Sequence, residues 1–239
     1  PAISDALWFG HEGNRGEALD WGTALEAGTR HLGAYQGHGN VAHPHGILIT
    51  WATITEGGIQ VNREGKRFWN EAQGYSEAAR VVLAQPGGEA VTIFDARIAS
   101  IARQFEDFRN AEAQGAVRSA DTLDELAAQL DLPADALHAE MSAITQGETD
   151  RFGRLWGETR LAPPYCAVRV TGALFHTQGG LVTDGSGRVM ATDGAAFPNL
   201  FAAGGAACGV SGAGDSGYLS GNGLLAAAVL GRAAGAAAL

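Results

Sequence analysis

The sequence has few cysteines, few basic residues and no long hydrophobic run. Its two cysteines, Cys166 and Cys208, provide neither a disulfide framework nor a metal-binding box, which favours a reducing, cytoplasmic environment. Lys and Arg total 16 against 26 Asp and Glu, a formal net charge of −10, which argues against a nucleic-acid surface. No stretch approaches the roughly 18 apolar residues of a membrane span, and no signal peptide is visible. We therefore expect a cytoplasmic protein that binds neither nucleic acid nor membrane.

Glycine, in contrast, is abundant. The 239 residues include 35 glycines, about twice the usual share of roughly 7%. Apolar residues make up 46% of the chain and charged residues 18%, a composition that excludes wholesale disorder and predicts a buried core. The first residue is Pro1 rather than Met, which favours a chain processed or cut from a longer protein.

Periodicity and turn residues predict a mixed α and β chain. Thr122 and Glu125 have the spacing of a helix capping box, and Pro133 is typical of the first turn of the next helix. Other helices are expected over 17–31, 76–84 and 224–234, and residues 146–162 are expected to form a loop. Strands are expected over 46–55, 59–62, 67–69, 90–94, 165–170, 179–183, 188–190 and 200–203.

The densest glycine stretch, residues 204–223, joins a predicted strand to the last predicted helix. Ser220-Gly221-Asn222-Gly223 at the start of that helix would present free backbone N–H groups to an anion or an electron-rich oxygen, and the helix dipole would add to the attraction. A glycine-rich connection to a packed helix explains the spacing equally well. No lysine follows the glycines, which argues against a Walker-type phosphate loop.

Several polar side chains are candidates for chemistry, each with a structural alternative. His176, just before Gly179-Gly180, either hydrogen-bonds a substrate carbonyl or cofactor edge or has a structural role. Tyr75 and Tyr218 lie in glycine-containing loops; a tyrosine whose environment lowers its pKa exchanges protons with a carbonyl substrate, and otherwise it only packs.

Two further groups favour a structural interpretation. Glu71 is expected to form an ion pair with Arg63 or Arg67 rather than to act as an acid or base. A histidine cluster, His38, His43 and His45, has no carboxylate or cysteine at ligand spacing, so we expect no metal site.

Four segments in order carry a resemblance. Residues 58–71, GIQVNREGKRFWNE, are close to the signature G-x-x-V-N-x-x-G-K-R-F-x-N-E, and residues 176–181 match H-T-x-G-G-hydrophobic. Residues 13–34 are similar to a glycine turn, helix and Gly-Ala, and residues 193–235 to a closing FAD segment. Together they resemble the flavoprotein family of fumarate reductases, succinate dehydrogenases, 3-ketosteroid dehydrogenases and tricarballylate dehydrogenases.

The resemblance implies an FAD cofactor and an α/β (α+β) fold in which an FAD-binding domain is split by an inserted α+β cap domain. Residues 1–45 would be the remainder of the FAD-binding domain, 46–164 the cap or substrate domain, and 165–239 the C-terminal FAD-binding segment. The family's opening Rossmann-like strand and G-x-G-x-x-G have no match here. The resemblance therefore implies a missing N-terminal half as partner, a fragment that is inactive alone and holds FAD poorly, and an exposed half-site able to self-associate.

Residue roles follow from the resemblance. The start of the last helix would meet the flavin, and the predicted cofactor-binding residues are Gly204, Gly205, Ser220, Gly221, Asn222, Gly223, Leu224 and Leu225. Gly205 stands where the family often has a ribose-binding Glu. His176 and His38 match histidines that bind substrate, although His43 competes with His38 for that assignment.

Two departures bear on the substrate. Fumarate reductases carry arginines where Tyr75 and Tyr218 stand, and without guanidinium groups a dicarboxylate loses its bidentate partners. Tyr218-x-Ser220 is similar to the Tyr-x-Ser of a ketosteroid 4-dehydrogenase. We therefore expect an FAD-dependent dehydrogenase or reductase acting on a C–C bond beside the carbonyl of a small ketone or steroid-like substrate.

In that prediction Tyr218 moves the proton, Tyr75 is a second hydroxyl, His176 binds the carbonyl and Ser220 supports them. One alternative is a reductase or dehydrogenase of a carboxylic acid such as fumarate or tricarballylate. Another is a non-catalytic interaction fragment.

Overall fold

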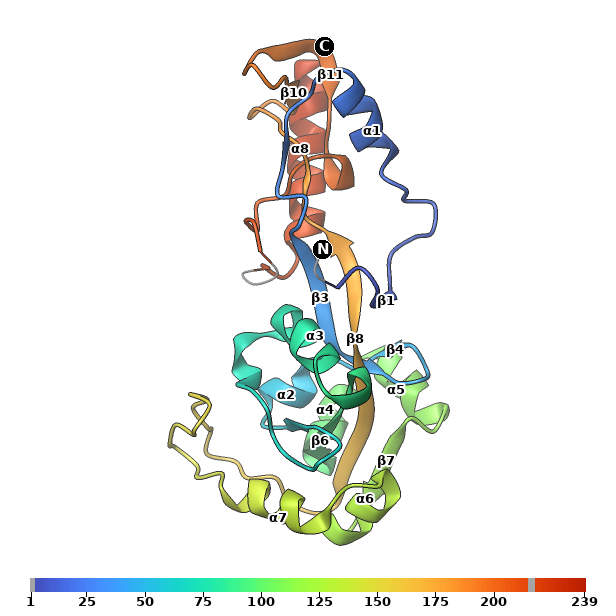
Figure 1. The fold of residues 1–239 in the computed structure, drawn as a ribbon, viewed down its shortest axis with the longest axis vertical. Helices are drawn as coiled ribbons and strands as arrows, with labels where there is room; N and C mark the ends of the chain where they lie inside the picture. The colour runs from blue at the N-terminus through green and yellow to red at the C-terminus, as the bar shows by residue number, and fades with distance from the viewer. Residues whose placement is uncertain (1–2, 215–217) are drawn as a thin grey trace. The chain divides into compact units, whose positions relative to one another are not determined.

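The computed structural model describes residues 3–214 and 218–239 and divides into two compact units (Figure 1). The first unit joins Pro1–Gly37 to Leu174–Leu239, and the second is His38–Ala173. The chain passes from one unit to the other within two strands, β3 (Tyr35–Ala42) and β8 (Tyr165–Thr177).

The second unit is built on an antiparallel sheet. Its strands follow the order β4 (Ile47–Leu48), β3, β8, β6 (Glu89–Asp95) and β5 (Ile59–Val61), and β7 (Val117–Ala120) also pairs with β8. The β6–β8 pairing runs from Glu89 opposite Thr171 to Asp95 opposite Tyr165. Every residue of β6 is buried, which fits its β-branched and aromatic composition. The core lies between this sheet and its helices.

Side-chain caps mark the start of some helices of the second unit. They are α2 (Ala52–Thr55), α3 (Tyr75–Leu83), α4 (Ala96–Ala102), α5 (Glu106–Ala113), α6 (Leu123–Leu130) and α7 (Ala134–Ser142), with the short 3-10 helices η1 (Glu71–Gln73) and η2 (Pro86–Gly88). The predicted capping box of Thr122 and Glu125 is confirmed at α6. Asp95 caps α4 by accepting the N–H of Ile98 at 2.9 Å, so the end of β6 also starts a helix.

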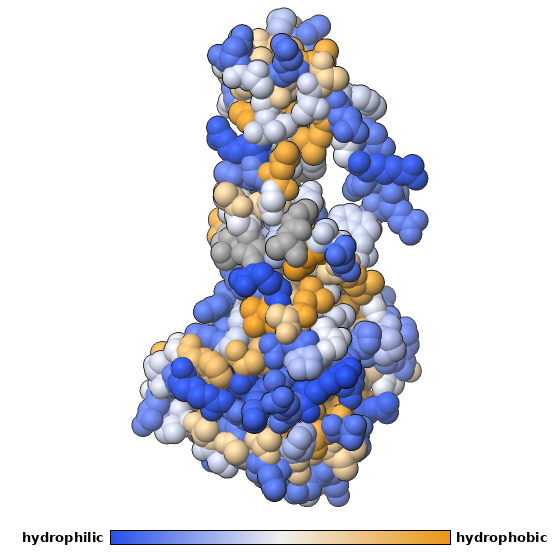
Figure 2. Space-filling model, viewed as in Figure 1, coloured by the Kyte–Doolittle hydropathy of each residue, from blue (hydrophilic) through white to orange (hydrophobic). Residues whose placement is uncertain are grey.

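The first unit has shorter strands and a smaller core. It contains β1 (Leu7–Trp8), α1 (Glu17–Ala24), the pair β2 (Thr29–Arg30) and β9 (Gly180–Leu181), and the pair β10 (Arg188–Met190) and β11 (Ala196–Phe201). After η3 (Gly204–Ala206), the chain ends in the long helix α8 (Asn222–Ala237). Its buried cluster consists of Ala27, Leu181, Val189, Ala202 and Ala207. Hydrophobic residues gather on the surface over α8 (Figure 2).

Several of the predicted elements are wrong in extent or type. The helix expected over 17–31 ends at Ala24 because Glu26 and His31 have positive φ angles of 63° and 57°. The strand expected over 46–55 contributes only Ile47–Leu48, and its second half is α2. Just before α2, Thr50 Oγ1 accepts the N–H of Ala52 at 3.4 Å, a local bond of the kind that competes with strand pairing.

Two further strands differ from the sequence prediction. Residues 67–69 form no strand and provide a single bridge, Val61 opposite Arg67. The strand expected over 165–170 continues to Thr177 as β8. The loop expected over 146–162 is confirmed, since no helix or strand is assigned there.

No helix in residues 3–214 and 218–239 is both long enough and apolar enough to cross a membrane.

Candidate functional site

The N-terminus of α8 is the first element of the candidate site. Gly221 precedes the helix at φ 78°, a left-handed conformation that glycine adopts without strain, and no side chain within the described residues caps the helix. Asn222 is buried; its backbone N–H donates to the Leu219 carbonyl at 3.0 Å, and its side-chain amide donates to Ser211 Oγ. The first turn of an α-helix directs its N–H groups and the positive end of its dipole outward. This end of α8 is therefore suited to an electron-rich group.

His176 and Tyr218 meet beside that helix end. His176 Nε2 lies 3.5 Å from the Tyr218 hydroxyl, and the two rings meet edge to face with centroids 5.5 Å apart. Gln178 Nε2 lies 3.0 Å from His176 Nδ1 and 3.4 Å from His176 Nε2, so it contacts both ring nitrogens. A Cβ built on Gly223 would stand 3.3 Å from His176 Cε1, so the imidazole packs against the first turn of α8. A phenol, an imidazole and helix amides are thus brought together within the first unit.

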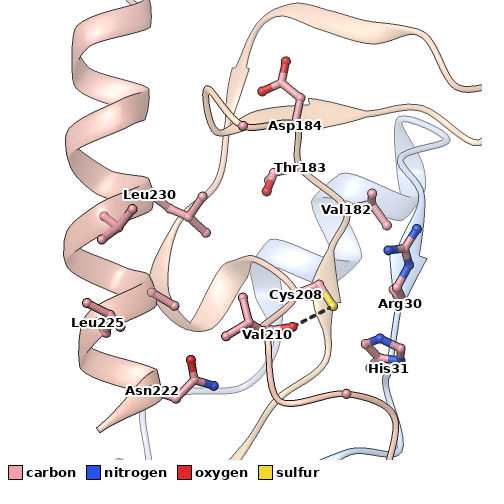
Figure 3. Close-up of a pocket in the computed structure, with 15 residues that line it drawn as sticks. Arg30, His31, Val182, Thr183, Asp184, Cys208, Val210, Asn222, Leu225 and Leu230 are labelled. Carbon is pink, nitrogen blue, oxygen red and sulfur yellow. Dashed lines mark hydrogen bonds between the residues drawn. The ribbon is translucent and has the colours of Figure 1, made fainter. Parts of the chain in front are cut away.

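A cavity of about 630 Å³ opens beside the same helix (Figure 3). Asn222, Leu225 and Leu230 of α8 lie on one side, and Arg30 and His31 lie on the opposite side. Figure 3 shows Val210 and Cys208 between these two walls. Burial raises the pKa of the Cys208 thiol, and its Sγ donates to the Gly209 carbonyl at 3.5 Å. A volume in this range, with apolar walls and a few polar groups, is typical of a cofactor or small-molecule pocket.

Glycines around this cavity have two different roles. A Cβ on Gly180 would come within 2.4 Å of the Ala207 backbone, and one on Gly179 within 2.5 Å of the His31 carbonyl. These two glycines are required by close packing of the chain on itself. A Cβ on Gly205 or Gly221, in contrast, would meet no heavy atom within 4 Å. At those positions the fold leaves room beside the backbone for a ligand.

The other predicted cofactor-binding residues are placed as follows. Gly204 lies in η3 at φ 58° and packs toward α8, where a Cβ would stand 3.6 Å from Ala227 Cβ. Ser220, Leu224 and Leu225 are exposed. The segment from Gly204 to Leu225 therefore begins beside α8 and ends within it.

A second cluster of predicted residues lies in the second unit. His38 is buried, and its ring stacks on Tyr75 with centroids 5.0 Å apart and planes 20° apart. Trp51 meets the His38 ring edge to face at 5.7 Å. Burial lowers the pKa of His38 to about 3, so the imidazole is neutral at physiological pH.

Glu71 has the structural role expected from the sequence. Its Oε2 accepts from Arg67 Nη2 at 2.6 Å and from Arg154 Nη1 at 3.1 Å, and all three side chains are buried. Arg67 also donates to Asp150 at 2.6 Å. Hydrogen bonds from Gln60 N–H to Glu71 and from Arg154 to the Ile54 and Gly58 carbonyls complete the network. The predicted ion pair with Arg67 is confirmed, and the most specific motif of the sequence stabilises the second unit.

The structure thus brings the predicted site residues together in two groups. His176 and Tyr218 meet in the first unit, and His38 and Tyr75 meet in the second. Sequence reasoning did not identify Gln178, Trp51 or Arg30. Gln178 was within reach, because it lies inside the H-T-x-G-G segment, whereas nothing in the sequence pointed to Trp51 or Arg30. Within residues 3–214 and 218–239 no group of three or more His, Cys, Asp or Glu residues is arranged to hold a metal ion.

A model of the FAD-binding domain matches residues 4–224. The chain belongs to this FAD-binding domain family. FAD is therefore its cofactor. The chain is 29% identical over 240 residues to a fumarate reductase (cytochrome) of Shewanella frigidimarina, covering 98% of this chain and 41% of that protein. A 4-oxocyclohexanecarboxylate 2-dehydrogenase of Sinomonas cyclohexanicum is 31% identical, covering 80% of this chain and 40% of that protein.

The fold of the FAD-binding domain family is also found among solved structures. A 3-ketosteroid-delta4-(5alpha)-dehydrogenase from Rhodococcus jostii RHA1, in complex with 4-androstene-3,17-dione, superposes with a TM-score of 0.66 at 25% identity. The alignment covers 95% of this chain and 46% of that one. The chain thus spans about two fifths of the length of the Shewanella and Sinomonas relatives.

The residues of the first unit fit an FAD group. The cavity of about 630 Å³ is large enough for part of such a ligand, and Asn222 and Leu225 reach it from the uncapped end of α8. The room beside Gly205 and Gly221 lets a flat group approach the backbone closely.

Proposed function

We propose that the protein containing this chain is an FAD-dependent oxidoreductase that acts on a C–C bond adjacent to the carbonyl of a ketone. The observation that carries the proposal is the meeting of Tyr218 and His176, 3.5 Å apart, against the first turn of α8. Bound FAD supplies the two-electron oxidation or reduction. The residues of the chain then have to bind the ketone, move one proton and stabilise charge on the cofactor.

Tyr218 is the proposed proton carrier. In the oxidative direction its phenolate oxygen would take the proton from the carbon beside the carbonyl and become the neutral phenol; in the reductive direction the phenol would return that proton to carbon and become the phenolate. His176 Nε2 borders the same hydroxyl and binds the carbonyl oxygen, while Gln178 fixes the imidazole ring. Ser220 and Tyr75 are the further hydroxyl groups that we propose for the reaction.

The cofactor-binding residues are proposed from the same geometry. N–H groups of Gly221, Asn222, Gly223 and Leu224 would face the electron-rich edge of the flavin, where preorganised donors stabilise negative charge. Gly204, Gly205, Ser220 and Leu225 complete the proposed set. In this proposal residues 1–45 and 165–239 belong to the FAD-binding part and residues 46–164 to the cap domain; the compact units observed change at Gly37 and at Ala173.

A ketone is the preferred substrate class. Tyr75 and Tyr218 occupy the places where the sequence resemblance puts arginines in dicarboxylate enzymes, and a phenol does not form the bidentate contacts of a guanidinium with a carboxylate. Support comes from the Sinomonas relative, which is named for an oxo acid with a ring, and from the Rhodococcus structure, which contains a steroid dione.

Fumarate or a related carboxylic acid is the second candidate. The Shewanella fumarate reductase matches this chain over 98% of its length. The first candidate predicts that the protein prefers ketones, and the second that it prefers carboxylic acids. Assays with both substrate classes therefore distinguish the two.

Replacement of Tyr218 by Phe tests the proposed chemistry. The experiment uses the FAD-loaded protein expressed from its complete gene and measures ketone turnover and bound flavin absorbance. We expect turnover to fall by about 100-fold or more, the range for loss of a general acid–base group, with flavin content unchanged. Tyr165→Phe, in β8 of the second unit, is the matched control and should retain turnover. Undiminished turnover in Tyr218→Phe would reject the role of Tyr218.

A further inference from the structure

Gln178 is fixed in place by both of its backbone groups. Its N–H donates to the Ala34 carbonyl at 2.9 Å, and its own carbonyl accepts the N–H of Gly209 at 2.8 Å. The residue is buried, so breaking either bond would leave a desolvated polar atom. Three segments that are distant in the sequence therefore meet at Gln178: the chain before β3, the chain after β8 and the glycine-rich segment before α8.

The side-chain amide of Gln178 is in contact with an imidazole and close to a glycine. Its Nε2 contacts both ring nitrogens of His176. A Cβ built on Gly209 would stand 2.9 Å from Gln178 Oε1 and 3.2 Å from the Gln178 carbonyl oxygen. Gly209 has no positive φ angle, so its backbone conformation does not itself require glycine. The amide and the carbonyl of Gln178 are what exclude a side chain there.

The first turn of α8 borders the same imidazole. A Cβ built on Gly223 would stand 3.3 Å from His176 Cε1 and 3.4 Å from His176 Nε2. A histidine side chain without such neighbours would populate several rotamers. The ring of His176 is only half-buried, so part of it remains accessible to a ligand. The Gln178 amide and the helix turn together restrict its orientation.

Gly209 also belongs to the wall of the cavity of about 630 Å³. It lies between Cys208 and Val210, and all three residues line the cavity. The backbone N–H of Cys208 donates to the Leu181 carbonyl at 2.9 Å, which anchors this wall to the buried cluster of the first unit. The wall of the cofactor cavity and the imidazole are thus connected through the amide of Gln178.

We propose that Gln178 is a positioning residue that holds the His176 imidazole for the substrate, and that Gly209, on the wall of the cofactor cavity, fixes Gln178 in turn. A hydrogen bond to a substrate carbonyl depends on its distance and direction. This inference rests on the proposed function, in which His176 binds the carbonyl oxygen, and deepens it. The cofactor cavity and the substrate-binding ring share one support, so a change at Gly209 alters the ring through Gln178.

The orientation of the ring is tested by ¹³C NMR of the FAD-loaded protein, expressed from its complete gene and labelled at the histidine rings. The His176 signal is assigned by its loss in His176→Asn. In Gln178→Met, which keeps the length of the side chain but has no N–H donor, we expect this signal to broaden or split, because the ring is no longer held in one orientation. Gln178→Glu keeps a polar contact with the ring and should retain one sharp signal.

Gly209→Ala tests the support of Gln178 without removing any group. The added methyl would displace the amide, so this variant should broaden or split the His176 signal as Gln178→Met does. Gly157→Ala is the matched control, because a Cβ on Gly157 would meet no heavy atom within 4 Å. Its His176 signal should match that of the wild type.

Kinetics separate positioning from packing. For 4-androstene-3,17-dione we expect kcat/KM to fall about tenfold or more in Gln178→Met and in Gly209→Ala, since a misplacement of about 1 Å can cost about 100-fold. The double variant should lie within about twofold of the less active single variant, because both changes act through one amide. Flavin content should be unchanged, and Gln178→Glu should recover most of the activity.

A single sharp His176 signal in both Gln178→Met and Gly209→Ala would overturn the proposal, and so would losses of kcat/KM that multiply in the double variant. The failure of the proposed function looks different: wild-type protein would then turn over no ketone. In that case the NMR signals still decide the inference, because they do not depend on turnover.

Discussion

The two units differ in how completely they bury their apolar and charged side chains. In the second unit a continuous core joins β5, β6 and β8 to helices α4 to α7, and its buried arginines are paired. In the first unit the buried cluster is small, and α8 exposes Leu224 at 82% and Leu225 at 63%. A contiguous exposed apolar surface is typical of a region that binds a ligand or another polypeptide. The contrast indicates that the second unit holds most of the buried, stabilising contacts, and that the first unit holds the exposed apolar surface that can bind a ligand or a polypeptide.

The largest effect expected from this comparison is on the second unit. Glu71→Gln leaves the buried guanidinium groups of Arg67 and Arg154 without their shared carboxylate, and loss of one member of a buried ion network costs about 3–5 kcal/mol. Hydrogen exchange measured by mass spectrometry should show faster exchange in peptides of residues 38–173 and little change in peptides of the first unit. Glu64→Gln, on an exposed turn, is the control. Equally faster exchange in both units would contradict the claim that this buried ion network stabilises the second unit in particular.

Within the first unit, one buried and one exposed leucine test the same difference between buried and exposed apolar side chains. Leu181 is 4% exposed and belongs to the small cluster, so Leu181→Ala should cost about 2–5 kcal/mol in unfolding free energy. Leu224→Ala should change it by less than about 0.5 kcal/mol, because its side chain is already in solvent. Denaturant unfolding of the 239-residue chain measures both. Similar costs for the two variants would show that α8 is as well packed as the cluster.

A smaller effect is expected from acid. Burial alone would raise the pKa of Asp150, but hydrogen bonds from Arg67 and from the backbone of Arg154 and Phe152 outweigh it and lower the pKa to about 2. A carboxyl group whose folded-state pKa is lowered stabilises the folded protein at pH values above the ordinary pKa of the group, 3.8. That contribution, about 2 kcal/mol, is lost as the pH falls from about 4 to about 2.

Asp150→Asn should therefore flatten the pH dependence of unfolding in that window, while Asp135→Asn, an exposed carboxylate of the same unit, should leave it unchanged. Thermal unfolding followed at several pH values measures the slope. An unaltered slope in Asp150→Asn would contradict the assigned pKa.

Local signals of the sequence predicted local structure, and the resemblance predicted the family. The capping box at Thr122 and the pair Arg67–Glu71 are contacts three and four residues apart, which the sequence displays directly. The FAD-binding family was recognised from motifs whose residues lie within short segments. Local contacts and short family motifs can both be recognised without knowing which distant segments of the chain are in contact.

Contacts between distant segments were out of reach. Strand β3 was missed because its glycines obscure the apolar pattern; a Cβ on Gly39 would come within 2.4 Å of Ala78 on α3, so close packing dictates the glycine. His176 and Tyr218 were each predicted, but their contact joins residues 42 positions apart. Trp51 could be grouped with the predicted residues His38 and Tyr75 only once the structure showed its ring beside theirs. These features depend on tertiary packing, which no local pattern encodes.

Substrate preference of the FAD-loaded protein, expressed from its complete gene, tests the central claim most directly. Oxidation of 4-androstene-3,17-dione and of cyclohexanone is followed with a dye as electron acceptor, and reduction of fumarate with a reduced dye as donor. We predict that at least one ketone has a kcat/KM about tenfold or more above that of fumarate, since neither Tyr75 nor Tyr218 compensates a carboxylate. Fumarate turned over faster than every ketone would contradict the account.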